Sequence, residues 1–155
     1  MMGTSMSVEL ATESDTMAFG RRIGSLLEPG DLVLLSGPLG AGKTVLTKGI
    51  AEGLGVEGRV SSPTFVIARE HLPAPEGRGV PLVHVDAYRL GDDLAQLDDL
   101  DLDTALVEAA VVIEWGENGT RLSENHLLVT LIRRADDSRV AEVTPSGSWE
   151  NRWST

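Results

Sequence analysis

The segment that most restricts the fold is a glycine-rich loop between an apolar run and a helix-forming stretch. Residues 37–44 read GPLGAGKT and match the pattern G-x-x-x-x-G-K-[ST] at every position. The apolar run at 32–35 predicts a buried strand before the loop, and residues 43–54 predict a helix that ends before Gly55. A strand, such a loop and a helix in this order are typical of an α/β domain that binds phosphate.

The residues of the loop are suited to binding phosphate. Glycines let the backbone wrap closely around a phosphate, and the amide groups then point inward as an anion nest. The helix that follows adds the positive end of its dipole. Lys43 supplies a charge for the β- and γ-phosphate oxygens, and the Thr44 hydroxyl can ligate Mg²⁺. A chance glycine-rich turn does not explain both motif and context, so the loop predicts nucleotide binding.

The rest of the chain predicts alternating strands and helices. Residues 13–27 have helical spacing, with Thr12 or Ser14 as the cap. The apolar runs 81–85 and 109–113 predict buried strands, and 127–132 with 140–143 predicts a hairpin. A β-rich stretch at 60–68 and one or two short amphipathic helices at 91–107 complete the pattern. We therefore expect a three-layer α/β sandwich with a mainly parallel central sheet and added antiparallel strands.

Length and composition narrow the class of protein. The 155 residues predict a single domain over 1–155, with a core at about 10–143 and a loosely ordered tail at 145–155. The absence of cysteine excludes disulfides and thiolate metal sites, and the net charge of −11 argues against a protein that coats nucleic acid by itself. No apolar run approaches a membrane span and no signal peptide is apparent. We expect a soluble cytoplasmic domain.

Two acidic residues lie at the ends of predicted strands. Asp86 follows the run 81–85, and Glu114 follows the run 109–113. A phosphate-binding loop needs an acid at the tip of a neighbouring strand to hold Mg²⁺ or to orient water. Either residue could instead be a solvated charge, and the sequence leaves open which acid serves the metal and which the water.

A hydroxyl-bearing segment follows the predicted loop helix. Ser62-Pro63-Thr64 stands where a switch that senses the γ-phosphate is found in several phosphate-loop proteins. On its own, the segment is better explained as an ordinary turn into a strand. The guanine-reading pattern N-K-x-D is missing from the sequence, which favours adenine over guanine.

Together these motifs resemble the TsaE family, also called YjeE. Its members are small bacterial P-loop ATPases needed for threonylcarbamoyladenosine modification of tRNA. The resemblance covers roughly residues 10–143, with Pro38 in the loop where the family commonly has Asp. Its matching segments are GPLGAGKT (37–44), SSPTF (61–65), HVDAYRL (84–90) and VIEWGE (112–117).

The resemblance implies ATP and Mg²⁺ as ligands. Thr44 and Glu114 match the family's Mg²⁺ positions, and Lys43, Asp86 and Glu114 are the catalytic candidates. The residues implied in nucleotide binding are Thr16 (near the base), Gly37, Pro38, Leu39, Gly40, Ala41, Gly42, Lys43, Thr44, Val45, Ser62, Thr64 and Trp115. The implied partners are TsaB and TsaD, which transfer threonylcarbamoyl to adenosine 37, while tRNA is held mainly by those subunits.

Two other functions fit the phosphate loop. A P-loop small-molecule kinase would need an acceptor pocket and an arginine-rich lid, neither of which the sequence shows clearly. A non-hydrolytic switch would use nucleotide occupancy alone to order a partner surface. Among the remaining residues, His84 is interpreted as a packed histidine and Arg133-Arg134 as part of an exposed turn.

Overall fold

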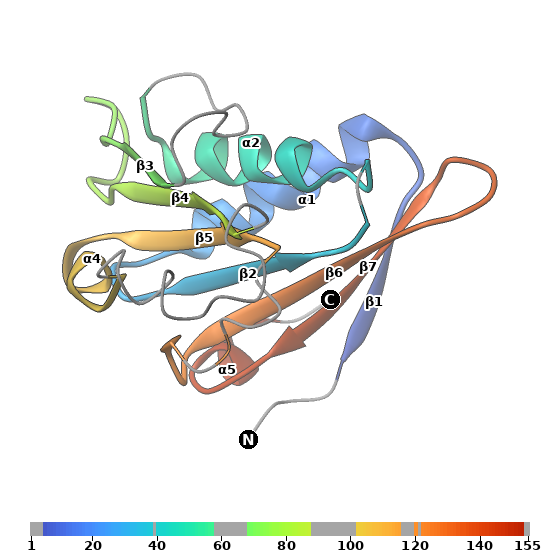
Figure 1. Ribbon diagram of the computed structural model, residues 1–155. Helices are drawn as coiled ribbons and strands as arrows, with labels where there is room; N and C mark the ends of the chain where they lie inside the picture. Colours follow the sequence, from blue (N-terminus) through green and yellow to red (C-terminus); the bar gives the residue numbers. More distant parts are fainter. Residues whose placement is uncertain are drawn as a thin grey trace.

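The computed structural model describes residues 5–38, 40–57, 68–87, 102–115, 120 and 122–153. Its centre is a seven-stranded sheet in the order β1-β7-β6-β2-β5-β4-β3 (Figure 1). The strands are β1 (Met6–Leu10), β2 (Leu32–Ser36), β3 (Ala68–His71), β4 (Leu82–Asp86), β5 (Ala110–Glu114), β6 (His126–Arg133) and β7 (Arg139–Pro145). The helices are α1 (Glu13–Leu26), α2 (Lys43–Leu54), α4 (Leu102–Glu108) and α5 (Trp149–Arg152).

The sheet has a parallel centre with antiparallel edges. Strands β6, β2, β5 and β4 run parallel to one another, whereas β3 pairs with β4, β7 with β6 and β1 with β7 in antiparallel fashion. This confirms the predicted mixed α/β architecture, including the hairpin of β6 and β7. The carboxyl ends of the parallel strands meet at one edge, where ligands of open α/β sheets bind.

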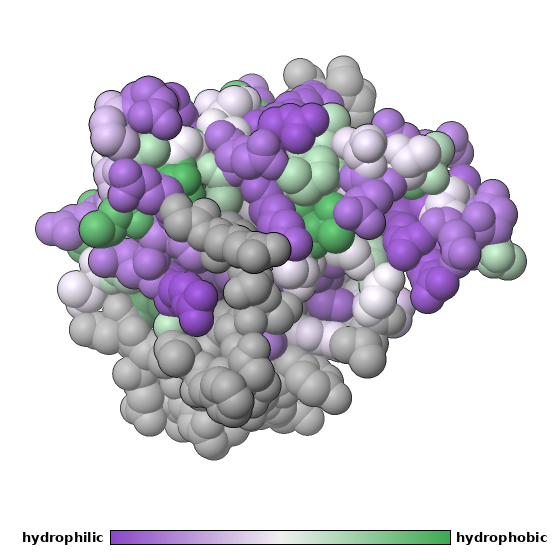
Figure 2. Space-filling model, turned by 90° about the horizontal axis from the view of Figure 1, so that it is seen from above, coloured by the Kyte–Doolittle hydropathy of each residue, from purple (hydrophilic) through white to green (hydrophobic). Residues whose placement is uncertain are grey.

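Helices cover both faces of the central strands. Every residue of β2 and β5 is buried, as continuous apolar runs predict for strands packed on two sides. Val33 and Leu35 belong to the core beneath α1 and α2, while Leu32 and Leu34 pack in a second core with α4. Seen from above, the coloured part of the surface carries mainly hydrophilic residues, with a few hydrophobic ones among them (Figure 2). Because successive side chains of a strand point to opposite faces of the sheet, the strands contribute to two cores, and the helices on the two faces make three layers.

Glycines bring α1 and α2 into backbone contact. A Cβ atom added at Gly24 of α1 would lie 2.1 Å from the carbonyl oxygen of Ile50, and one at Gly49 of α2 would lie 2.4 Å from that of Met17. Gly20 and Gly53 meet the opposite helix just as closely. Side chains would hold the helices further apart, so the glycines set their spacing. This packing places α1 directly over the helix that begins at the phosphate loop.

The predicted ends of the two main helices are confirmed. Thr12 caps α1 in a capping box with Asp15: the Asp15 amide donates to Thr12 Oγ1 at 3.2 Å, and the Thr12 amide donates to Asp15 Oδ2 at 3.0 Å. Gly55 ends α2 in the left-handed conformation and donates its amide to Ala51. Local sequence signals are sufficient for both ends.

The tail is packed through Trp153, so the expectation of loose order from residue 145 is wrong for this part. Strand β7 continues to Pro145, and the Trp149 side chain in α5 is fully buried. Trp153 packs edge-on against Phe19 of α1, with ring centroids 5.7 Å apart. Two buried tryptophans contribute enough apolar area to order a short segment.

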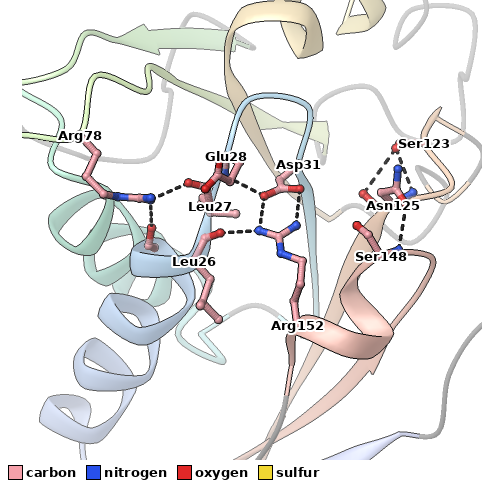
Figure 3. A network of polar contacts seen from close by, with 10 residues as sticks. Leu26, Leu27, Glu28, Asp31, Arg78, Ser123, Asn125, Ser148 and Arg152 are labelled. Atoms are coloured by element: carbon pink, nitrogen blue, oxygen red, sulfur yellow. Dashed lines mark hydrogen bonds and ion pairs between the residues drawn. The ribbon is translucent and has the colours of Figure 1, made fainter.

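An ion pair fastens this tail to the turn between α1 and β2 (Figure 3). Arg152 donates to both carboxylate oxygens of Asp31 at 2.7 Å and to the Leu26 carbonyl. These hydrogen bonds raise the pKa of Arg152. Arg78 donates to the carbonyls of Gly24 and Leu27, which satisfies groups that the end of α1 leaves open.

The structure adds one strand that was not predicted. Strand β1 pairs with β7 from Met6 opposite Val143 to Leu10 opposite Arg139. The predicted β-rich stretch 60–68 and helices at 91–107 lie mostly outside the described residues, apart from the start of β3 and part of α4. In the part of the chain that the structure describes, no helix is long and apolar enough to cross a membrane.

Candidate functional site

The glycine-rich loop connects the carboxyl end of β2 to the first residue of α2. Gly37 has φ +136°, and a Cβ there would lie 2.5 Å from the Leu131 carbonyl oxygen of β6. Gly42, just before α2, has φ +105°. At Gly37, only glycine tolerates both the positive φ angle and the close neighbouring strand, whereas Gly42 is required for its φ angle alone. The loop therefore holds the N-terminus of α2 against the edge formed by the central strands.

The Lys43 side chain folds back into its own loop. Its Nζ atom donates to the carbonyl oxygens of Gly37 at 2.7 Å and Pro38 at 2.9 Å, and the residue is 5% exposed. The same ammonium lies 3.8 Å from the ring centroid of Trp115, within the range of a cation–π contact. The positive charge is thus fixed inside the loop by backbone dipoles and one aromatic face.

The structure separates the two predicted acids by their distance from the loop. Glu114 ends β5, the strand next to β2, and its Oε1 atom accepts a hydrogen bond from Thr44 Oγ1 at 3.2 Å. Asp86 ends β4, one strand further out, and lies opposite Glu114 in the register. Glu114 is buried, whereas Asp86 is half-buried. Glu114 therefore contacts the phosphate loop directly through Thr44.

These residues line one cleft at the edge of the sheet. The cleft has a volume of about 380 Å³, and its walls include Lys43, Thr44, Asp86, Glu114 and Trp115. A hollow of this size with few, convergent polar groups is typical of a small-molecule site. The structure thus brings together the lysine, the hydroxyl, both acids and the tryptophan that the sequence indicated separately.

Thr16 lies beside this cleft. It is buried in α1 and lines a smaller cavity of about 140 Å³ together with Leu10 of β1. Gly42 and Val45 line both hollows, so the two adjoin. The close packing of α1 on α2 is what brings Thr16 to the phosphate loop.

Trp115 has an unusual backbone conformation. Its φ angle is +61°, which bulky residues rarely adopt. The residue directly follows Glu114, and this turn of the chain directs the ring toward Lys43. Unusual dihedrals of this kind often occur at functional sites.

His84 contacts the site through Glu114, which the sequence interpretation missed. The histidine is fully buried in β4, as a packed residue would be, yet its Nε2 atom is hydrogen-bonded to Glu114 Oε2. A weak signal was available in the sequence. His84 and Asp86 are two residues apart on one strand, so both point to the same face.

Arg139 of β7 is a second residue that the sequence did not indicate. Its Nε atom donates to the carbonyl of Ala41 at 3.2 Å and its Nη2 atom to that of Gly40 at 3.1 Å. Arg139 thus braces the second half of the phosphate loop. It lies 98 residues from Ala41 in the chain, and only strand pairing brings the two together.

The arginines before the β6–β7 turn are partly exposed, as predicted. Arg133 pairs with Asp137 at 2.5 Å, and Arg134 pairs with Glu9 at 3.3 Å. The hydrogen bond from Arg133 lowers the pKa of Asp137. The predicted switch residues Ser62, Pro63 and Thr64, and Leu39 of the loop, lie outside the described residues.

The chain is similar to known proteins of one family. Residues 10–141 match the family model of the threonylcarbamoyl adenosine biosynthesis protein TsaE. The TsaE protein of Streptomyces coelicolor is 53% identical over 139 residues, covering 88% of this chain and 92% of that protein. The TsaE protein of Mycobacterium tuberculosis H37Rv is 54% identical over 134 residues, covering 82% of this chain and 79% of that protein.

A solved structure is also similar. The crystal structure of YdiB from Bacillus subtilis superposes with a TM-score of 0.73 at 30% sequence identity, covering 99% of this chain and 90% of that one. The family match spans the loop, both acidic strand ends and most of the β6–β7 hairpin. The chain belongs to the TsaE family of threonylcarbamoyl adenosine biosynthesis proteins.

Proposed function

We propose that the chain is a magnesium-dependent ATPase that acts on the TsaB–TsaD complex in the formation of threonylcarbamoyladenosine at position 37 of tRNA. The observation that carries the proposal lies in the phosphate loop. Lys43 is enclosed by the carbonyls of its own loop, while the adjacent Thr44 donates to the buried Glu114. The pathway comes from the family, and TsaB and TsaD are the partners that the sequence resemblance implies.

Lys43 would bind the β- and γ-phosphates. An ammonium forms stronger hydrogen bonds with anionic oxygens than with neutral carbonyls, so phosphate would compete with Gly37 and Pro38 for it. The loop from Gly37 to Val45 and the N-terminus of α2 would surround the same oxygens. The cavity beside Thr16 supports a place for the base, which we propose to be adenine.

Thr44 and Glu114 fit a magnesium ion. Hydroxyl and carboxylate oxygens are the donors that Mg²⁺ prefers, and here the two side chains lie within 3.2 Å of each other. When bound, the ion would neutralise charge on the phosphates. The position of Asp86 on the next strand supports a role in orienting the attacking water. Ser62 and Thr64 are proposed to sense the γ-phosphate.

Catalysis would rest on positioning and fixed charge, which supply most of the rate in phosphoryl transfer. The isolated chain is expected to hydrolyse ATP slowly and to speed up on its partner complex. In the described structure, Arg139 donates hydrogen bonds to the carbonyls of Gly40 and Ala41. A faster reaction would therefore need groups or rearrangements that the partner induces.

The test is ATP hydrolysis by the purified chain, alone and with TsaB, TsaD and tRNA. We expect stimulation by the complex and a loss of about 100-fold or more in Lys43→Ala. Lys48→Ala is the matched control, because Lys48 is an exposed lysine in the same helix. It should behave as the unmodified chain does.

Other outcomes would overturn the proposal. Full tRNA modification by a variant that binds ATP without hydrolysing it would indicate a non-hydrolytic switch. Transfer of phosphate to a small molecule in a metabolite screen would indicate a kinase. Stimulation that survives Lys43→Ala would show that the phosphate loop is not the site of turnover.

A further inference from the structure

We infer that His84 is a positioning residue, whose ring holds the Glu114 carboxylate in the orientation that serves Thr44 and the metal. This inference rests on the proposed magnesium site. Among the described residues, His84 is not part of the cleft lining, and its hydrogen bond to the site is the one with Glu114. Its effect would pass through Glu114 alone.

The two oxygens of Glu114 have different partners. Oε1 accepts from Thr44 Oγ1 of the phosphate loop, and Oε2 is bonded to His84 Nε2 of the neighbouring strand. A carboxylate held at both oxygens cannot rotate without breaking one of these contacts. The Glu114 oxygen on the loop side is therefore directed by the histidine behind it.

The backbone beneath this pair is rigid. His84 lies opposite Val112 and Asp86 lies opposite Glu114 in the parallel register of β4 and β5. Both strands lie inside the sheet, and the residues His84 and Glu114 are 0% and 4% exposed. Water therefore has little access to replace either partner. Burial makes a lost contact costly and the orientation well defined.

The ring of His84 differs from the other buried histidines in the partner that it binds. Within the described part of the chain, Nδ1 of His84 is buried and has no hydrogen-bond partner, as is also true of Nε2 in His71 and in His126. The other ring nitrogen of His84 is the one that binds a carboxylate of the site. The single polar contact that the ring makes is the one with Glu114.

Hydrogen bonds behind a metal ligand tune its affinity for the metal. Loss of such a partner typically weakens metal binding by about 10–100-fold. Removing the imidazole should leave Glu114 buried with one free oxygen, able to turn away from Thr44. We therefore expect a specific loss of the magnesium contribution to nucleotide binding, while binding without metal is retained.

The experiment measures the affinity for a fluorescent non-hydrolysable ATP analogue, with Mg²⁺ and with EDTA. The dissociation constant in EDTA divided by the dissociation constant with Mg²⁺ reports the contribution of the metal. We expect His84→Leu and His84→Asn to lower this ratio by about tenfold or more, to the value of Glu114→Gln. His84→Gln should restore it, because its amide nitrogen reaches the position of Nε2. Affinity in EDTA should stay unchanged in the His84 variants.

Two comparisons separate positioning from general damage. His126→Leu removes another buried histidine of the same sheet, which bonds Ser123 and not Glu114, and should leave the ratio unchanged. In the Glu114→Gln background, His84→Asn should have no further effect, because the inferred route passes through that carboxylate. Near-ultraviolet circular dichroism confirms that each variant is folded.

The failures are distinguishable. If Glu114→Gln leaves the ratio unchanged, the proposed magnesium site is wrong and the inference falls with it. If Glu114→Gln lowers the ratio but folded His84→Asn does not, only the role of His84 is overturned. An additive loss in the double variant would also overturn it.

Discussion

Gly24→Ala tests the glycine-mediated contact between α1 and α2. Alanine is the better helix former and would by itself stabilise α1 by about 1 kcal/mol. The structure predicts the opposite sign, because the new methyl carbon would lie 2.1 Å from the Ile50 carbonyl oxygen and 2.8 Å from the Leu54 nitrogen. Both atoms belong to the backbone of α2, so no side chain can turn aside.

The magnitude follows from the separation that the methyl group requires. A carbon and a carbonyl oxygen need roughly 3.3 Å, so the helices must move apart by about 1 Å at this point. A gap of about 1 Å loses up to half of each dispersion contact across the interface. We place the cost at the upper end of the overpacking range, about 3 kcal/mol. After the gain in helix propensity, the net loss is about 2 kcal/mol.

Urea unfolding followed by circular dichroism measures the difference in the free energy of unfolding. In thermal unfolding, Tm should fall by about 4–8 °C. Ser25→Ala is the control, since it adds no bulk at an exposed neighbouring position of the same helix. It should change the free energy of unfolding by no more than about 0.5 kcal/mol. If Gly24→Ala were as stable as the unmodified chain or more stable, helix propensity would outweigh the backbone contact and the reasoning would be refuted.

Two further predictions concern the tail and the edge of the sheet. Arg152→Met should destabilise the chain by about 2 kcal/mol in urea unfolding, because Asp31 is left buried without its bidentate partner. Arg134→Met removes only the exposed pair with Glu9, and a loss as large as that of Arg152→Met would contradict this account. Burial lowers the pKa of His71 below its ordinary value of 6.5, so the unfolded chain binds more protons and stability is lost as pH falls below about 6.5. His71→Leu should reduce the loss of stability between about pH 7.5 and pH 5.5, and an unchanged loss would exclude His71 as its source.

Much of the fold could be predicted because its signals are local. The apolar run of β2, the GPLGAGKT loop, the Thr12 cap and Gly55 each act on their immediate neighbours in the chain. The hairpin of β6 and β7 is local in the same sense. Lys43 and Thr44 follow from the motif itself, since the loop and the helix after it determine where both residues lie.

Elements that depend on distant partners were missed. Strand β1 alternates between half-buried and exposed residues and is stabilised by pairing with β7, more than 100 residues later. The tail was expected to be loose, yet it is ordered by burial of Trp149 and by the contact of Trp153 with Phe19. Composition indicates neither that β1 pairs with β7 nor that the tail packs against α1.

The position of the two acids relative to the phosphate loop also depends on distant parts of the chain. The strand pattern leaves Asp86 and Glu114 equivalent, because each follows a short apolar strand, and only the family resemblance distinguishes them in the sequence. The strand order β2-β5-β4 makes them different: β5 lies next to the strand that carries the loop, and β4 lies one position further out. Glu114 therefore reaches Thr44, and His84 on β4 comes to lie behind it. The sequence determined which residue types are present at the strand ends. Only the tertiary structure decided which of them touch, because strand order is set by packing across the whole sheet.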